Sequence, residues 1–148
     1  PSFPTRGSSD VGCVLVELHT GAALFDGRSE LEQLHKMQAV LGPLPVTMVS
    51  AAEAKPRERF FTERGLLQDL PQSAHIPTRS LAQILGVRGG AGPSGRRAGQ
   101  AGHAEEVYLL FLDLVARLLA YDPAKRLSTS ELLNHPFFAP LHTQHPVQ

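Results

Sequence analysis

The chain has 148 residues, and its 14 basic residues balance its 14 acidic ones, so its formal net charge is zero. An apolar content of 42% and a charged content of 19% are typical of globular proteins, which excludes wholesale disorder. Zero net charge gives no support for long-range attraction to nucleic acid or to an anionic membrane. Cys13 is the only cysteine, which excludes an internal disulfide and a multi-cysteine zinc site and favours a reducing compartment.

The two ends of the chain are predicted to be less ordered than its middle. Residues 1–10 are rich in Pro, Ser and Gly and are expected to fray, and residues 139–148 are expected to form a tail. The ordered domain is therefore predicted to span residues 11–138. No apolar stretch reaches the roughly 18 residues of a membrane-spanning helix, and the first residues show no signal-peptide pattern. A chain that begins at Pro1 is expected to be a piece of a longer protein, the alternative being that processing removed a starting methionine.

The first ordered element is predicted to be a helix that starts at Val11 and is capped by Gly21. Its apolar residues recur at helical spacing, with one more on a second side: Val11, Val14, Leu15, Leu18 and Val16. So much apolar surface is typical of a deeply buried helix.

A second helix is predicted to begin after Ser29. Ser29 and Glu32 have the spacing of a capping box, in which each side chain accepts a hydrogen bond from the other residue's backbone N–H. Gly42 and the prolines after it should end this helix. Residues 44–80 have no clear period and are predicted to be less regular, and a short helix is expected at residues 81–85.

Residues 86–102 are rich in Gly and Arg. Seven of them are Gly, three are Arg and none is acidic, so little buried surface is available to offset the entropy of ordering the backbone. We therefore predict a flexible insertion.

A long helix is expected to follow over residues 105–120, and a second capping box, Ser128 with Glu131, should start a short last helix.

Two short motifs contain the letters of phosphate- or metal-binding sequences in the wrong setting. Residues 90–95 read GAGPSG and match G-x-G-x-x-G, yet no strand is predicted before them and a proline interrupts them. Residues 25–27 read FDG, whereas the Mg²⁺-binding motif is D-F-G. Neither G-x-x-x-x-G-K-S/T nor H-E-x-x-H occurs. We therefore predict no catalytic, cofactor-binding or metal-binding residue in this chain.

Three histidines and the cysteine are the remaining candidates for chemistry. His135, His142 and His145 fall within eleven residues and would bind zinc only if the backbone brought them together. The alternative is that His135 packs or caps at the last helix. Cys13 lies on the first helix, where an inert core thiol is expected, because a nucleophilic thiol needs an exposed electropositive setting.

Arginines provide two further candidates. Those of the Gly-rich segment form a small basic cluster: Arg88, Arg96 and Arg97. A solvated loop is the expected state of this cluster, with weak contact to an anion or RNA as the alternative. Arg126 lies in a turn between two apolar helices, where a buried arginine usually has a carboxylate partner. Asp122 and Glu131 are the nearby acids, so a local ion pair is predicted.

Three segments together resemble one known family. Residues 11–21 (VGCVLVELHTG), 24–27 (LFDG) and 30–42 resemble the F and G helices of eukaryotic protein kinases, and the phrase ending at Phe138, LxxYDPAKRLSTSELLNHPFF, resembles the junction of helices H and I. Within the kinases, these patterns are similar to the dual-specificity tyrosine-regulated kinases of the CMGC group. Lys55–Arg64 and Leu81–His103 resemble the insertion of that family's type 1 members. The implied fold is a mainly α, partial C-terminal lobe, helices F to I, that carries the flexible insertion.

The resemblance implies an enzyme that transfers the γ-phosphoryl group of ATP to protein Ser/Thr, and to its own Tyr, with Mg²⁺. The kinase Gly-rich loop, strand Lys, helix-C Glu, H-R-D-x-x-x-x-N and D-F-G are missing here, because they precede the F helix in family order. The family's F helix also starts with D-x-W-S-x-G-C, where this chain has Gly7 and Ser9 in place of Asp and Trp. Arg126 matches the arginine that pairs with the glutamate of A-P-E, which is absent, so the resemblance implies an arginine without that partner.

Three functional hypotheses follow from these residues. The first is a kinase portion that binds no ATP and is inactive alone. The second is a non-catalytic interaction module that binds protein substrates or docking proteins through the lobe surface, without nucleic acid or membrane. The third is a poorly folded product that exposes Val14, Leu15 and Leu18 because the neighbours of the F helix are missing. The family implies a location in the nucleus, the cytoplasm or both, and the oligomeric state stays open.

Overall fold

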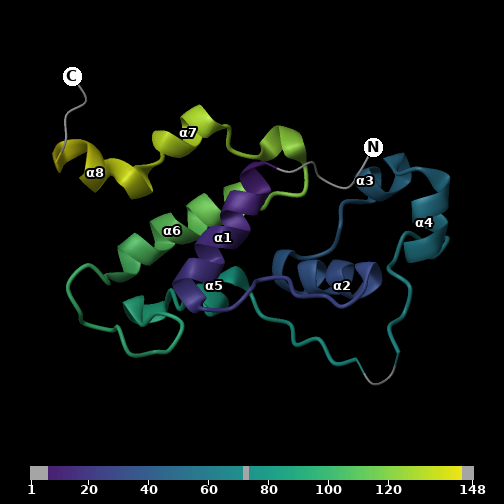
Figure 1. Ribbon diagram of the computed structural model, residues 1–148, viewed down its shortest axis with the longest axis horizontal. Coiled ribbons are helices and arrows are strands. Elements are labelled where there is room, and N and C mark those ends of the chain that lie inside the picture. Colours follow the sequence, from purple (N-terminus) through teal and green to yellow (C-terminus); the bar gives the residue numbers. More distant parts are fainter. Residues whose placement is uncertain (1–6, 72–73, 145–148) are drawn as a thin grey trace.

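The computed structural model describes residues 7–71 and 74–144 (Figure 1). The α-helices are α1 (Ser8–Thr20), α2 (Glu30–Leu41), α3 (Val46–Ala51), α4 (Ala54–Phe60), α5 (Leu81–Leu85), α6 (Glu105–Leu118), α7 (Thr129–Leu133) and α8 (Ala139–Gln144). Short 3-10 helices lie at η1 (Arg88–Gly90), η2 (Pro123–Lys125) and η3 (Pro136–Phe138). No strand occurs within the described ranges, apart from one isolated bridge between Phe61 and Leu67. The prediction of a mainly α fold is confirmed.

Helix α6 is the centre of the main core. It contacts α1, α5, η1 and η3, and Figure 1 shows α1 lying alongside it. Leu114, Val115 and Leu118 on α6 are fully buried, as are Val16 on α1 and Leu85 on α5. Full burial of such a side chain contributes about 1.5–3 kcal/mol, so this cluster holds the helices together.

A second core lies beneath α2, α3 and α4. Its buried side chains come from these helices and the loops beside them: Leu34, Leu44, Val49, Phe60, Phe61 and Leu67. Helices α3 and α4 were not predicted, since residues 44–80 lack a clear period. Helices of six or seven residues are unstable alone and depend on tertiary packing, which here comes from Val49 and Phe60.

Local signals fixed most helix ends. The N–H of Gly21, at a left-handed φ of 79°, donates to the Glu17 carbonyl and ends α1 as predicted. The predicted capping box of Ser128 and Glu131 is present in full. The box predicted at Ser29 is only half formed. The Ser29 hydroxyl accepts from the N–H of Glu32, but the Glu32 carboxylate accepts from the Arg28 N–H instead, at 3.0 Å.

Helix α1 differs from its prediction in extent and in burial. It begins at Ser8, within the segment predicted to fray, rather than at Val11. The predicted deep burial is wrong, because Val16 is fully buried while Leu18 is 79% exposed. The reason is that α6 packs on one side only, where Gly12 lets the helices approach: a methyl group on Gly12 would lie 2.9 Å from Leu119. At the other end, α8 occupies part of the predicted tail.

Residues 86–102 follow a series of turns closed by backbone hydrogen bonds. The N–H of Gly92 donates to Gly86 at 3.0 Å, and the N–H of Arg97 donates to Ala91 at 2.9 Å. Gly90 is buried at a φ of 63°, where a methyl group would overlap the carbonyl of His103. The segment therefore has more local structure than its composition indicated, and its flexibility in solution stays a prediction.

Candidate interaction surfaces

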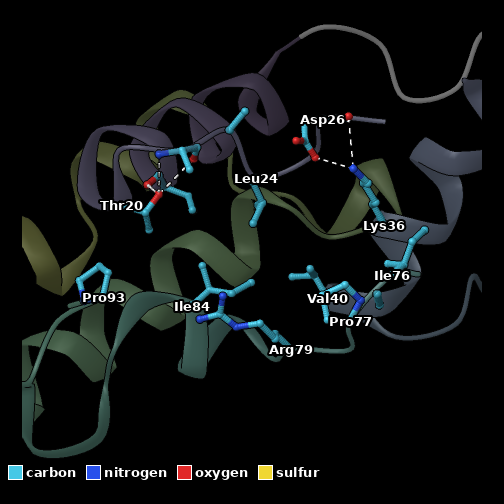
Figure 2. Close-up of a pocket in the computed structure, with 14 residues that line it drawn as sticks. Thr20, Leu24, Asp26, Lys36, Val40, Ile76, Pro77, Arg79, Ile84 and Pro93 are labelled. Atoms are coloured by element: carbon cyan, nitrogen blue, oxygen red, sulfur yellow. Dashed lines mark hydrogen bonds and ion pairs between the residues drawn. The ribbon is translucent and has the colours of Figure 1, made fainter. Parts of the chain in front are cut away.

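A pocket of about 450 Å³ lies between α1, α2 and residues 76–84 (Figure 2). Figure 2 shows Leu24 pointing into it from the loop after α1, opposite Ile84 of α5, with Val40 of α2 at one side. Gly21 places this loop, because its left-handed backbone ends α1 and turns the chain toward α2. The wall formed by Leu24 therefore depends on a local signal, and the remaining walls come from distant parts of the chain.

An ion pair between Asp26 and Lys36 lies at one side of this pocket (Figure 2). The Lys36 Nζ lies 2.6 Å from Asp26 Oδ1 and 3.3 Å from Glu32 Oε1. The hydrogen bond from Lys36 lowers the pKa of Asp26, and the same bond raises the pKa of Lys36. Lys36 is therefore already neutralised by two carboxylates.

Arg79 lies on the other side of the pocket from that ion pair in Figure 2. Its side chain is exposed and forms no hydrogen bond or ion pair with another residue of the described ranges. No sequence pattern predicts Arg79, Asp26 or Lys36 as a site residue. Opposite charges ten residues apart, joined by a loop and a helix, do not specify a distance.

The side of α1 away from α6 is a second candidate surface. Val11, Val14 and Leu18 are 40%, 52% and 79% exposed, and their spacing places them along one stripe. Exposed apolar stripes of this kind are typical of surfaces that associate. The expected exposure of Val14 and Leu18 is confirmed, whereas Leu15 is half-buried and packs against the main core.

Arg126 binds the backbone at the end of α6. Its Nε donates to the carbonyl of Ala120 at 2.7 Å, and Nη2 donates to the carbonyl of Tyr121 at 3.1 Å. Among the described residues it has no carboxylate within ion-pair distance, so the predicted pair with Asp122 or Glu131 is wrong. The arrangement agrees with the expectation, from the resemblance to protein kinases, of an arginine without a carboxylate partner.

The two acids near Arg126 are engaged in caps. Asp122 Oδ1 accepts from the N–H of Ala124 at 2.9 Å, and Glu131 accepts from the N–H of Ser128 at 2.8 Å. These short-range bonds leave Arg126 to the carbonyls of Ala120 and Tyr121, just after α6. Burial, opposed by the charge of Asp122, lowers the pKa of Arg126, which remains charged.

A groove of about 370 Å³ joins Arg126 to the start of α1 and to α2. Cys13 lines this groove and is half-buried. Burial raises the pKa of the Cys13 thiol, and the nearby carboxylate of Asp10 raises it further. A thiol in this setting carries little thiolate at neutral pH and is a poor nucleophile.

Of the two alternatives stated for His135, the structure shows the packed one, and the cap lies on η3 instead of the preceding helix. His135 is 4% exposed, and its Nδ1 accepts from the N–H of Phe137 at 3.2 Å, which caps η3. The side chains of His142 and His145 lie outside the described part of the structure. Among the described residues, no three His, Cys, Asp or Glu side chains lie together where they could hold a metal ion.

The remaining motifs form no site. Residues 90–95 lie at the end of η1 and in the turns after it, and no described strand precedes them. The three arginines of the Gly-rich segment are exposed, and Arg97 Nη1 lies 3.2 Å from His103 Nε2. In the described part of the chain, no helix combines the length and apolar character needed to cross a membrane.

Comparison with known proteins relates the chain to protein kinases. It is 37% identical over 130 residues to serine/threonine-protein kinase AFC3 of Arabidopsis thaliana, a match that covers 86% of this chain and 30% of that protein. It is 35% identical over 137 residues to dual specificity protein kinase CLK2 of Mus musculus, covering 92% of this chain and 24% of the relative. A probable serine/threonine-protein kinase, clkA of Dictyostelium discoideum, is 32% identical to it over 127 residues, a match that covers 86% of this chain and 12% of that protein. No family model matches the sequence.

The chain thus spans about a third or less of the length of the curated relatives it matches. Its similarity to these kinases extends over most of its own residues, and its mainly helical fold is consistent with part of a kinase C-terminal lobe.

Proposed function

We propose that this chain forms helices F to I of the C-terminal lobe of a protein kinase close to the dual-specificity tyrosine-regulated group. The observation that carries the kinase proposal is the 35% identity to dual specificity protein kinase CLK2 over 92% of the chain, whereas the dual-specificity tyrosine-regulated assignment rests on the sequence resemblance alone. The exposed stripe of α1 supports it, because the F helix of a kinase lobe packs against neighbours that no described segment supplies. The chemistry of the complete protein would be transfer of the γ-phosphoryl group of ATP to protein Ser/Thr, and to its own Tyr.

The described residues do not fit a site for ATP and Mg²⁺. No three metal-binding side chains lie together among them, and Asp26 of the FDG tripeptide is held by Lys36. Phosphoryl transfer depends on positioned cations and carboxylates around the phosphates. We therefore expect these 148 residues alone to bind no nucleotide and to transfer no phosphate.

A radiolabelled ATP assay tests this proposal. The purified chain, supplied with Mg²⁺ and a protein substrate, should incorporate no label. The same chain extended by the residues encoded upstream of Pro1 should be active if those residues contain the kinase motifs. Turnover by the short chain would refute its inactivity, and upstream residues without any kinase motif would refute the kinase proposal.

A second candidate function is docking of protein partners through the lobe surface, which the pocket beside α2 and the stripe on α1 favour. A pull-down with the chain and with a variant lacking residues 86–102 would show whether the Gly-rich segment takes part.

We also propose a nuclear or cytoplasmic location, which imaging of a fluorescent fusion of the full parent protein would test.

A further inference from the structure

We propose that the pocket between α1, α2 and residues 76–84 binds a segment of a partner protein that presents aliphatic side chains next to acidic ones. This inference rests on the proposed docking function and gives it a location and a ligand chemistry. It uses three properties of the pocket, which are its size, its apolar walls and its uncompensated charge.

The pocket has the size and lining of a ligand site. A volume of about 450 Å³ lies within the usual range of roughly 300–1,000 Å³ for such sites. Its apolar walls come from four parts of the chain, with Leu24 before α2, Val40 on α2, Ile76 before α5 and Ile84 on α5. Fully buried Val16 belongs to the same lining. An aliphatic side chain that entered would exchange water for apolar contacts on several sides.

Most polar groups of the pocket already have partners. Lys36 contacts the Asp26 carboxylate, the Asp26 carbonyl and the Glu32 carboxylate. The Thr20 hydroxyl donates to the carbonyl of Val16 at 2.8 Å. These groups offer little to a polar ligand, so the walls select for apolar side chains.

Arg79 is the exception and sets the charge preference. Its guanidinium has five N–H donors, and none is used by another residue of the described ranges. The lining contains two cations, Arg79 and Lys36, against one anion, Asp26. Glu32, which contacts Lys36 from outside the lining, balances the second cation, so Arg79 is the charged group of the lining that stays unpaired among the described residues, and it favours a carboxylate beside the apolar side chain. A pocket with one unpaired cation among its described lining residues, in a chain of zero net charge, does not match the repeated charges of a nucleic acid backbone.

The test is fluorescence anisotropy with the full chain and a fluorescein-labelled peptide, Gly-Ser-Leu-Leu-Glu-Glu-Ser-Gly. We expect saturable binding of this peptide. Replacing its leucines by serine, or its glutamates by lysine, should weaken binding by roughly fivefold or more, because each change removes one of the two complementary features.

Two pocket variants and one control locate the site. Arg79→Glu should weaken binding by roughly fivefold or more, since it replaces an attraction with a repulsion. Ala23→Trp should weaken peptide binding as well, because Ala23 is an exposed lining residue and the indole ring of Trp would occupy the pocket. Arg96→Glu makes the same charge change at an exposed arginine outside the lining and should leave binding unchanged. Circular dichroism would verify that all three variants fold.

Absence of peptide binding, or binding that survives both pocket variants, would overturn this inference. Equal binding of the glutamate and lysine peptides would overturn the acidic preference. The docking function has a separate readout, because partners captured in a pull-down by the wild-type chain and also by Arg79→Glu would keep that function and remove the pocket from it.

Discussion

The Nε2 atom of His135 lies 3.0 Å from Oδ2 of Asp113, and this hydrogen bond joins the turn after α7 to helix α6. The other ring nitrogen, Nδ1, accepts from the N–H of Phe137. A neutral imidazole carries one proton, so Nε2 is the donor to the carboxylate. Arg117 Nε lies 3.0 Å from the same oxygen, which makes Asp113 the shared anchor of two side chains.

The first prediction concerns the pH dependence of this anchor. The hydrogen bond from His135, supported by Arg117, lowers the pKa of Asp113. A lowered folded-state pKa stabilises the protein above the unfolded pKa of about 3.9, and this stabilisation is lost as the pH falls through the folded pKa. Asp113→Asn should therefore reduce the free energy of unfolding near neutral pH by up to about 1 kcal/mol, since the carboxylate is half exposed.

Urea unfolding followed at several pH values would measure this difference. The wild-type and Asp113→Asn curves should converge as the pH falls through the folded-state pKa of Asp113, below which its carboxyl group is neutral like the amide of Asn. A difference that stays constant from acidic to neutral pH would show that the charge of Asp113 contributes nothing.

The second prediction concerns Arg126. Arg126→Met keeps the apolar stem but removes the donors to Ala120 and Tyr121, leaving two carbonyls at the end of α6 without them. We expect a loss of about 1–3 kcal/mol in the free energy of unfolding, as for hydrogen bonds to charged groups. Lys125→Met is the matched control, because Lys125 is exposed and its removal should change stability little. Equal losses in urea denaturation would refute the role of Arg126.

The third prediction concerns the two sides of α1. Leu18→Glu should leave the fold intact and reduce self-association, because Leu18 is 79% exposed and belongs to the apolar stripe. Val16→Glu, two residues away and fully buried, should unfold the chain, since a carboxylate there would have to lose its hydration. Light scattering coupled to size exclusion measures association, and circular dichroism measures folding. A soluble, folded Val16→Glu variant would contradict the packing of α1 against α6.

The fourth prediction tests whether residues 86–102 keep their turns in solution or move freely. Gly89 and Gly90 both have positive φ values, but a methyl group on Gly89 meets open space while one on Gly90 overlaps the His103 carbonyl. Gly89→Ala should cost about 1 kcal/mol for its backbone conformation. Gly90→Ala should cost clearly more, because η1 or His103 must also move.

Thermal unfolding and hydrogen exchange of the two glycine variants would be compared side by side. Equal effects at both positions would indicate that the segment moves freely and that its contact with His103 is not maintained in solution.

Short-range signals predicted much of the helical structure, but of the pocket they placed only the turn at Gly21 that precedes Leu24. Ser128 and Glu131 are three residues apart, so their capping box could be predicted from the sequence alone. The structure contains this capping box. The partners of Arg126 were predicted wrongly because Asp122 was already engaged by the nearby N–H of Ala124, a competition that composition does not reveal. Arg79 could not be recognised from the sequence as a site residue, because the pocket that it lines is completed by α1 and α2, which lie far from it in the sequence.

The sequence by itself determined that helices α1, α2 and α6 form and where glycine ends the first two, because turns and caps depend on residues only a few positions apart. Tertiary structure alone decided which side of α1 is buried and which charge beside the pocket stays unpaired. Those outcomes depend on which distant segments come into contact: α6 covers Val16 and leaves Leu18 exposed, and Asp26 engages Lys36 while Arg79 has no such partner in the described chain.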